Sequence, residues 1–266
     1  MKLPTAILLL VAVSSTPAHA YLPVREDLLV QCQSRHDTQD TITVAYALVS
    51  DSGRQEVALV VAPDAWAWTY LPGAENPDYE WHDGKRRDGE AGARIQTPAP
   101  IRFDTLFASH RCESLLTALE KAGIEWKRAT TVVHATERRS AVVYGNPDVN
   151  WIAWDRTSFR PVAAQWVVAG GAELPEGTEP GSWWRVLYEL RYRDFRNLPD
   201  TVVITRELYA PAAQPQSGLT ATGFAAAPAP TPTDPLHRSV VTLKRLGTPE
   251  RIPDPRKGTN RPRGRG

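Results

Sequence analysis

The second half of this chain is a run of short segments in which apolar and polar residues alternate, with turn sequences between them. The segments are 130–134, 140–144, 151–154, 161–169, 183–192 and 201–209. A period of two is typical of β-strands that bury one face. Consecutive strands joined by short turns predict an antiparallel meander, and the two helices expected elsewhere are too few for a doubly wound α/β sheet.

The first half adds strands and both helices. Alternating residues on either side of Ser50–Gly53 predict a hairpin, Trp66 and Trp68 mark a third strand, and Asp83-Gly84 is a strong hairpin turn. A short helix is expected over 23–32, from Pro23 to Cys32. The clearest helix begins at Asp104, a favourable N-cap residue, and ends at Gly123.

This order of elements predicts a mainly β (α+β) fold. A long curved antiparallel sheet with one apolar face needs a cover on that face. We expect an open half-barrel covered by one or two helices, with the helix over 104–123 as the principal cover.

Residues 1–20 have the pattern of a cleavable signal peptide. Lys2 precedes a short apolar run at 7–13, and Ala18-His19-Ala20 supplies the small residues that signal peptidase needs. No cysteine stands at the expected cleavage point, so a lipid anchor is not expected. The pattern predicts a periplasmic protein.

The remaining chain divides near residue 210. Residues 21–210 are expected to form the half-barrel domain. Residues 211–266 are rich in proline and carry nine Lys and Arg residues against three Asp and Glu, which predicts a disordered basic tail. The segment 237–246 is a candidate docking element within that tail. Either the tail contacts an envelope protein or an anionic surface, or it is a solvated chain that keeps the protein soluble.

Cys32 and Cys112 are the only cysteines. In an oxidising compartment they favour a disulfide, which would close a loop of about 80 residues and stabilise the fold by about 4 kcal/mol. Two unpaired buried thiols are the alternative.

One stretch resembles a known family. Val142-Val143-Tyr144-Gly145, followed by Asn150 to Val162 with an aromatic strand, an Asp155-led turn and a restart at Pro161, is similar to a strand-turn-strand of the LolA/LolB-like lipoprotein-sorting proteins. The order of elements over about 25–210 also fits. The resemblance implies an unclosed barrel with a helical lid that holds acyl chains. The basic residue on which that family depends matches no position here. Taken by itself, Asp155–Ser158 suits a type I turn of purely structural role.

Nine tryptophans and a single methionine are unusual for a chain of this length. Indole suits a half-wet apolar wall, because its ring is apolar and its N–H still finds a partner. We expect a lipid-binding lining, and the alternative is that these rings fill the core. The expected lining residues are Trp66, Trp68, Leu115, Leu116, Leu119, Trp154 and Trp166.

No catalytic motif is present in the sequence. It lacks a G-x-S-x-G elbow, an H-E-x-x-H helix, a glycine-rich phosphate loop and a Cys/His metal-ligand spacing. We therefore expect no enzyme activity, no cofactor, no bound metal and no nucleic-acid partner.

Two functions remain. The first is a periplasmic carrier or chaperone that binds the acyl chains of a lipid or lipoprotein in a helix-lidded apolar cavity. The second is a non-enzymatic envelope interaction protein of the same fold, with a filled core and a basic tail that recruits a partner.

Overall fold

The computed structural model describes residues 22–35, 41–62, 65–69, 79–82, 85–87, 97–127, 129–134, 139–170, 174–193, 198–211, 234–248 and 250–252. The expected signal peptide at 1–20 lies outside these residues.

One antiparallel sheet of 13 strands dominates the described part of the chain, with the order β5-β4-β3-β2-β1-β12-β11-β10-β9-β8-β7-β6 and with β13 paired to β1. Its first strands are β1 (Thr41–Ser50), β2 (Gly53–Val61), β3 (Ala65–Thr69), β4 (Tyr79–His82) and β5 (Lys85–Arg87). The meander continues through β6 (Ala129–His134), β7 (Arg139–Gly145), β8 (Trp151–Asp155), β9 (Pro161–Ala169), β10 (Trp183–Arg191) and β11 (Thr201–Tyr209). The last two are β12 (His237–Arg245) and β13 (Glu250–Ile252).

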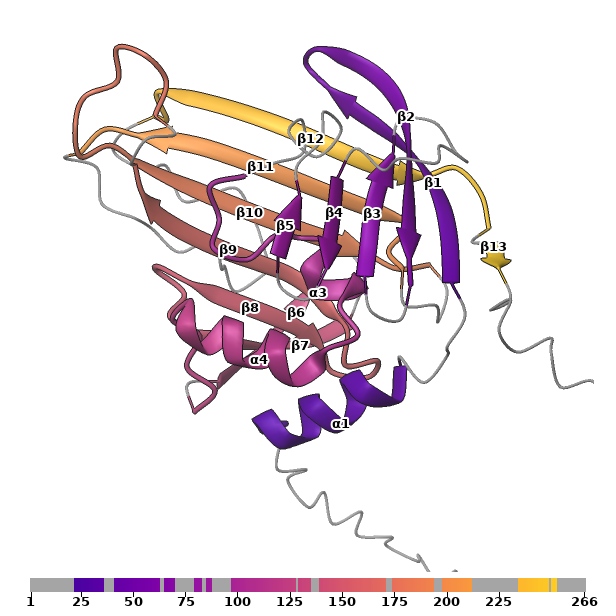
Figure 1. Cartoon of the computed structure of the whole chain (residues 1–266). Coiled ribbons are helices and arrows are strands. Elements are labelled where there is room, and N and C mark those ends of the chain that lie inside the picture. Colours follow the sequence, from indigo (N-terminus) through magenta and orange to yellow (C-terminus); the bar gives the residue numbers. More distant parts are fainter. Residues whose placement is uncertain are drawn as a thin grey trace, which may run out of the picture.

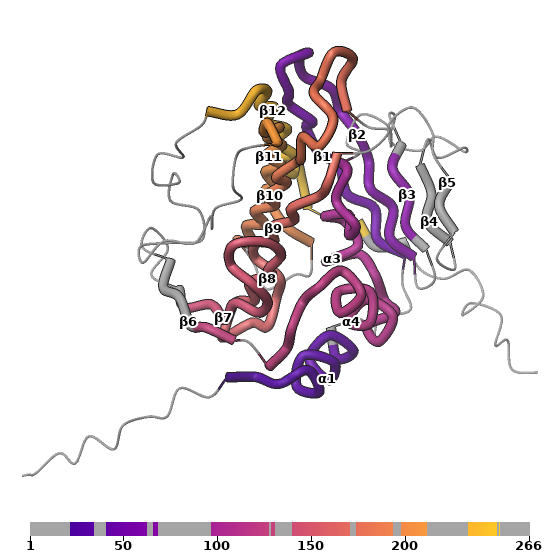
Figure 2. Tube along the Cα trace, turned by 90° about the vertical axis from the view of Figure 1, so that its left-hand side faces the viewer, coloured from indigo at the N-terminus to yellow at the C-terminus, as the bar shows by residue number. Residues whose placement is uncertain are grey.

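The sheet bends into two wings and does not close (Figure 1). Figure 2 shows β1–β3 on one side, β7–β11 on the other, and the helices α3 and α4 between them. The predicted mainly β half-barrel is therefore confirmed. Each predicted strand after residue 129 appears within a residue or two of its expected bounds, and His82 pairs with Lys85 across the expected Asp83-Gly84 turn.

The turns follow their local chemistry. Asp155 Oδ1 accepts the backbone N–H groups of Thr157 (3.0 Å) and Ser158 (2.6 Å), as an Asp-led turn requires. Gly145, between β7 and β8, has φ 99°, and a Cβ there would lie 2.4 Å from the carbonyl oxygen of Asn150. Only glycine fits this turn.

The prediction that residues 211–266 form a disordered tail is wrong for the residues of this segment that form β12. Residues 237–245 form β12, which lies in the middle of the sheet between β1 and β11 (Figure 1). Val241 and Leu243 point to the helix side and are buried, so this segment has the apolar face that a strand needs. The sheet domain therefore extends past residue 210, and the idea of a docking element at 237–246 is replaced by a central strand. Residues 212–233 lie outside the described part.

The helix predicted over 104–123 is interrupted. It forms α3 (Thr105–Ala108) and α4 (Cys112–Lys121), because Ser109 has extended dihedrals (φ −71°, ψ 120°) that end α3. Both predicted ends are confirmed. Asp104 accepts the N–H of Thr105 at 2.9 Å, and Gly123, with φ 92°, follows the last turn. The N-terminal helix α1 (Arg25–Arg35) begins slightly later than expected.

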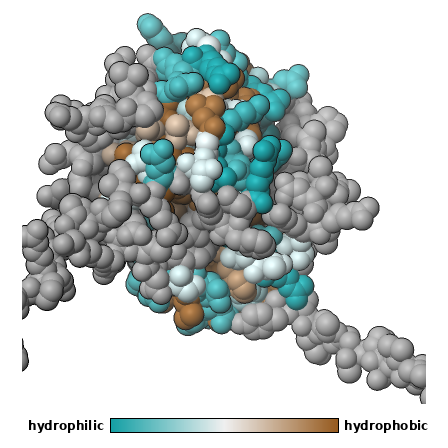
Figure 3. Space-filling model, turned by 90° about the vertical axis from the view of Figure 1, so that its right-hand side faces the viewer, coloured by the Kyte–Doolittle hydropathy of each residue, from teal (hydrophilic) through white to brown (hydrophobic). Residues whose placement is uncertain are grey.

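None of the described helices is long and apolar enough to span a bilayer. On the face in Figure 3, hydrophobic side chains lie between hydrophilic ones rather than in one continuous patch. The large apolar side chains exposed in the described part are Leu22, Val24, Val30, Val49, Leu236 and Leu246.

The position of β12 gives the first prediction. Leu243 is 0% exposed on the helix side, and its replacement in Leu243→Ala should lower the free energy of unfolding by about 3 kcal/mol. Urea unfolding followed by circular dichroism measures this loss. Thr242→Ala, on the opposite side of the same strand, is the matched control and should cost less than about 1 kcal/mol. Equal small losses in both variants would contradict a central β12.

Candidate functional site

The concave side of the sheet and the helices enclose one large apolar cluster, which is the candidate site. All seven expected lining residues lie in it: Trp66, Trp68, Leu115, Leu116, Leu119, Trp154 and Trp166. Each is at most 6% exposed. They come from β3, α4, β8 and β9, so segments that are distant in the sequence meet in this cluster.

Side chains alternate between the two faces along each strand, and this alternation determines which tryptophans lie on the concave side. Ile152 and Trp154 face the helices, whereas Trp151 and Ala153 belong to a separate buried cluster on the other face of the sheet. Trp184, which the sequence reading did not select, also lies in the concave cluster. Trp183 and Trp184 are adjacent and therefore point to opposite faces of β10. The sequence alone does not decide which of the two rings faces the helices.

Around Phe103 the interior is filled by the protein's own rings. The centroid of Phe103 lies 6.0 Å from that of Trp68, 6.2 Å from Phe107 and 6.0 Å from Tyr188. Tyr46 is 5.8 Å from Trp68 on its other side. This half of the cluster, between the β1–β3 wing and α3, is a packed aromatic core.

A buried carboxylate organises that core. Asp104, 0% exposed, accepts from Trp68 Nε1 at 2.8 Å and from the Arg102 guanidinium at 2.6 and 3.1 Å. It also begins α3 through the N–H of Thr105. One side chain therefore fixes the end of a helix, the rotamer of a tryptophan and the position of an arginine. Neither Arg102 nor the pairing was apparent from the sequence, where Asp104 indicated only a helix start.

Two tyrosines are held neutral in the interior. Burial raises the pKa of Tyr46 and of Tyr188. The hydroxyl of Tyr46 donates to the carbonyl of Pro199 at 2.8 Å, and that of Tyr188 lies 2.5 Å from Thr97 Oγ1. These hydroxyls are structural contacts rather than acid or base groups.

The other half of the cluster, over β9–β12, carries different polar groups. Arg206 on β11 donates from Nε to Ser239 Oγ on β12 at 3.0 Å. Trp166 and Trp184 are buried there, and the indole N–H of each has no hydrogen-bond partner. The sequence analysis did not single out Arg206; an arginine at the apolar-face position of Val202-Val203-Ile204-Thr205-Arg206 is the signal that could have found it.

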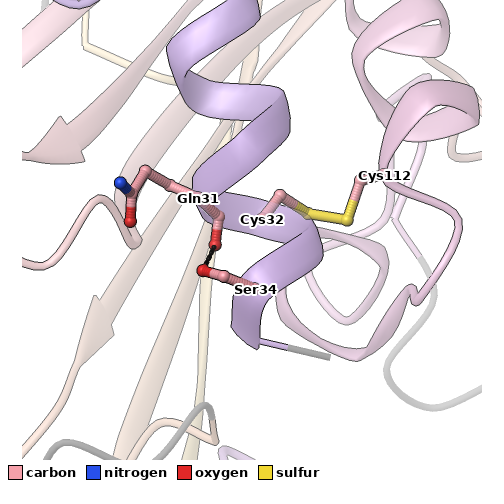
Figure 4. The surroundings of a disulfide bond; sticks show 4 residues. All are labelled: Gln31, Cys32, Ser34 and Cys112. Atoms are coloured by element: carbon pink, nitrogen blue, oxygen red, sulfur yellow. Dashed lines mark hydrogen bonds between the residues drawn. A yellow bond between two sulfur atoms is a disulfide. The ribbon is translucent and has the colours of Figure 1, made fainter. Parts of the chain in front are cut away.

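A disulfide fastens the helices together below the sheet. Cys32 of α1 is bonded to Cys112 at the start of α4, with a Cα–Cα distance of 5.9 Å (Figure 4). Of the two alternatives left open by the sequence, the disulfide is the one that forms.

Ion pairs and hydrogen bonds reinforce that link. Arg25 of α1 donates to Glu120 at 2.7 Å and to Glu113 at 2.5 Å, both on α4, and the hydrogen bond from Arg25 lowers the pKa of Glu113. Tyr144 on β7 donates to the carbonyl of Pro23 at 2.5 Å. The two helices thus form one cover tied to the β6–β9 wing.

No group of three His, Cys, Asp or Glu side chains is placed to hold a metal ion within the described ranges. The described polar groups of the concave side are paired carboxylates, arginines, hydroxyls and indole N–H groups. These groups include hydrogen-bond donors and acceptors and one or more positive charges.

Comparisons with known proteins give similar folds only. No family model matches the chain, and no curated protein matches it. Among solved structures, it is similar to a LolA superfamily protein from Nitrosomonas europaea, with 10% identity and a TM-score of 0.36 over 88% of this chain and 96% of that one. It is also similar to MucB in complex with MucA(peri), with 13% identity and a TM-score of 0.22 over 86% of this chain and 94% of that one.

A third similar structure is the Pseudomonas aeruginosa MucA/MucB complex, with 13% identity and a TM-score of 0.23 over 82% of this chain and 92% of that one. At such identities the likeness concerns the fold alone.

The disulfide between the covering helices gives the second prediction. The double variant Cys32→Ser, Cys112→Ser should lose about 4 kcal/mol of unfolding free energy, because the bond closes a loop across a sequence separation of 80. Guanidinium unfolding of the oxidised protein and the variant measures the difference. The oxidised protein unfolded with and without reductant is the control, and a variant as stable as the oxidised protein would contradict a stabilising bond.

Proposed function

We propose that this protein is a non-catalytic carrier of the bacterial envelope that works in the periplasm. It holds the acyl chains of a lipid or lipoprotein between the concave sheet and the helices α3 and α4. The observation that carries this proposal is the convergence of the seven expected lining residues on the inner side of a sheet that stays open.

The physical case rests on the apolar inner face. Each methylene that a ligand buries there contributes about 0.8 kcal/mol, so an acyl chain binds tightly without any specific polar contact. Access requires an unclosed wall, and β5 and β6 end the described sheet without pairing to each other. An apolar inner face and two sheet edges that do not pair with each other together support the proposal.

The periplasmic location has independent support. Disulfides persist in oxidising compartments, and Cys32–Cys112 is buried at the centre of the helical cover. The signal-peptide pattern at 1–20 points to the same compartment.

The third prediction tests the carrier function through its cargo. Protein purified from a bacterial periplasm should carry lipid that native mass spectrometry detects. Leu116→Gln, at a position that is 0% exposed on α4, should abolish that cargo, because it places an amide among the lining side chains.

Ser114→Gln is the matched control, since Ser114 is exposed on the same helix, and it should keep the cargo. Circular dichroism establishes that both variants are folded. Lipid-free wild-type protein, or Leu116→Gln protein that still carries lipid, would refute the carrier.

A second candidate function is supported by the packing around Phe103. If protein rings fill the whole interior as they fill that half, the fold serves as an envelope interaction module. Its contact would be made by the basic C-terminal residues of the chain, which include Arg261, Arg263 and Arg265. Because β12 is part of the sheet, the chain must be cut after it and not at residue 211.

The fourth prediction separates this module from the carrier. A chain that ends at residue 253 should lose binding to phosphatidylglycerol vesicles while keeping its thermal unfolding temperature, since five Lys and Arg residues are removed with one Asp. Vesicle co-sedimentation measures binding, and phosphatidylcholine vesicles are the control. If the full chain and the shortened chain bind equally, the C-terminal residues do not make the contact.

A further inference from the structure

The turn that joins β8 to β9 holds an aromatic side chain in an unusual backbone conformation. Among the described residues other than glycine, Phe159 alone has a positive φ, at 53°. A side chain makes this left-handed region costly, so a phenylalanine stays there only where its neighbours hold it. The ring of Phe159 is partly buried and packs against the concave cluster. Phe159 therefore lies at the boundary between the apolar interior and solvent.

The backbone on both sides of Phe159 is fixed. Asp155, which is 6% exposed, accepts the backbone N–H of Phe159 on its carbonyl oxygen at 2.8 Å, and its carboxylate accepts two further N–H groups of the turn. Arg160 is buried on the other side, with its guanidinium carbon 5.1 Å from the centroid of the Tyr192 ring. Because its neighbours are held, the strain of the turn is concentrated at Phe159.

The same end of β8 departs from regular strand pairing. The register between β8 and β9 shifts between Ala153 and Trp154, and Trp154 lies opposite Pro161. Bulges and register shifts of this kind re-aim side chains and are common beside functional sites. Trp154 is one of the expected lining residues, and Phe159 packs against the same cluster. The irregular pairing and the strained residue therefore flank one part of the concave side.

The helical cover is tied to the opposite end of β8. Asn150, directly before β8, donates from Nδ2 to the carbonyl of Ala122 at the end of α4, at 2.8 Å. Tyr144, close to the end of β7, donates to the carbonyl of Pro23 just before α1. The two ends of β8 therefore differ, since one is fastened to the helices and the other leads into the turn that carries the partly exposed ring of Phe159.

We propose that the ring of Phe159 is a gate to the concave interior. In its packed position the ring closes the interior at this end of β8, and when the turn relaxes the ring moves outward and admits the acyl chain of a ligand. Relaxation relieves backbone strain but removes the ring from its apolar contacts, so the two effects oppose each other and the closed and open arrangements can exchange. This assignment rests on the proposed carrier function and adds the route of entry to it.

The fifth prediction measures the rates of ligand exchange. Stopped-flow fluorescence follows the binding and release of the neutral apolar probe N-phenyl-1-naphthylamine by the full chain. Phe159→Ala should raise both the association and the dissociation rate constants at least about fivefold, because a gate limits entry and exit alike. The dissociation constant of the probe should change less than about twofold, because the ring is not part of the lining.

A second variant and a control accompany this measurement. Phe159→Gly removes the same ring and also the strain, because glycine adopts a φ of 53° without steric cost. It should raise both rate constants as Phe159→Ala does and should unfold at a higher urea concentration than Phe159→Ala, so the test remains usable if the alanine variant does not fold. Leu187→Ala is the matched control, because Leu187 is a partly buried apolar side chain that packs on the opposite face of the sheet. It should leave both rate constants unchanged.

Unchanged rate constants in both Phe159 variants, each shown by circular dichroism to be folded, would overturn the gate and leave the carrier standing. Weaker binding that comes from faster dissociation alone would also overturn the gate, because Phe159 would then belong to the lining. If the wild-type protein does not bind the probe, the carrier and the gate fail together.

Discussion

The hydrogen bonding of β12 on both of its sides is the constraint on which the fold depends. Eight residues pair with β11, from His237 with Leu208 to Lys244 with Thr201, and four pair with β1, from Thr242 with Val49 to Arg245 with Tyr46. Arg245 also forms an ion pair with Asp200 and donates its backbone N–H to the Asp200 carbonyl at 2.8 Å. Without this strand, β1–β5 and β6–β11 would be separate sheets, and no single concave face would exist.

That joined sheet explains why the helices sit where they do. The inner apolar face of a bent sheet with two wings is too wide for one short helix to cover. The helical segment breaks at Ser109, so two helices, α3 and α4, cover this face. The first, α3, lies between the wings and is fixed by Asp104 (Figure 2). The second, α4, is bonded to α1 and lies against the β6–β9 wing, so each wing has its own partner.

Most of the meander could be predicted from the sequence, because period two, Asp155 and Gly145 act locally. β12 escaped prediction because its strand-like residues Val240-Val241-Thr242-Leu243 follow a long proline-rich segment and not a short turn after β11. The paired residues of β11 and β12 are 29 to 43 positions apart in the sequence, and pairing at such separations leaves no local trace. For the site, alternation fixed which tryptophans share a face, whereas the pairing of Asp104 with Arg102 and Trp68 needed the fold.

Trp68 and Trp166 differ in whether the chain supplies a hydrogen-bond acceptor for the indole N–H. Both are large, buried and part of one cluster, yet Trp68 meets a carboxylate that the chain itself supplies, and Trp166 meets none. Each unpaired buried donor costs about 1–3 kcal/mol, so the carboxylate of Asp104 removes for Trp68 a cost that remains at Trp166. Indole N–H groups without a hydrogen-bond partner occur on both faces of the sheet, at Trp166 and Trp184 on the concave side and at Trp151 on the other. The side chains around Phe103 and Asp104 therefore form the part of the interior in which the chain satisfies its own buried polar groups.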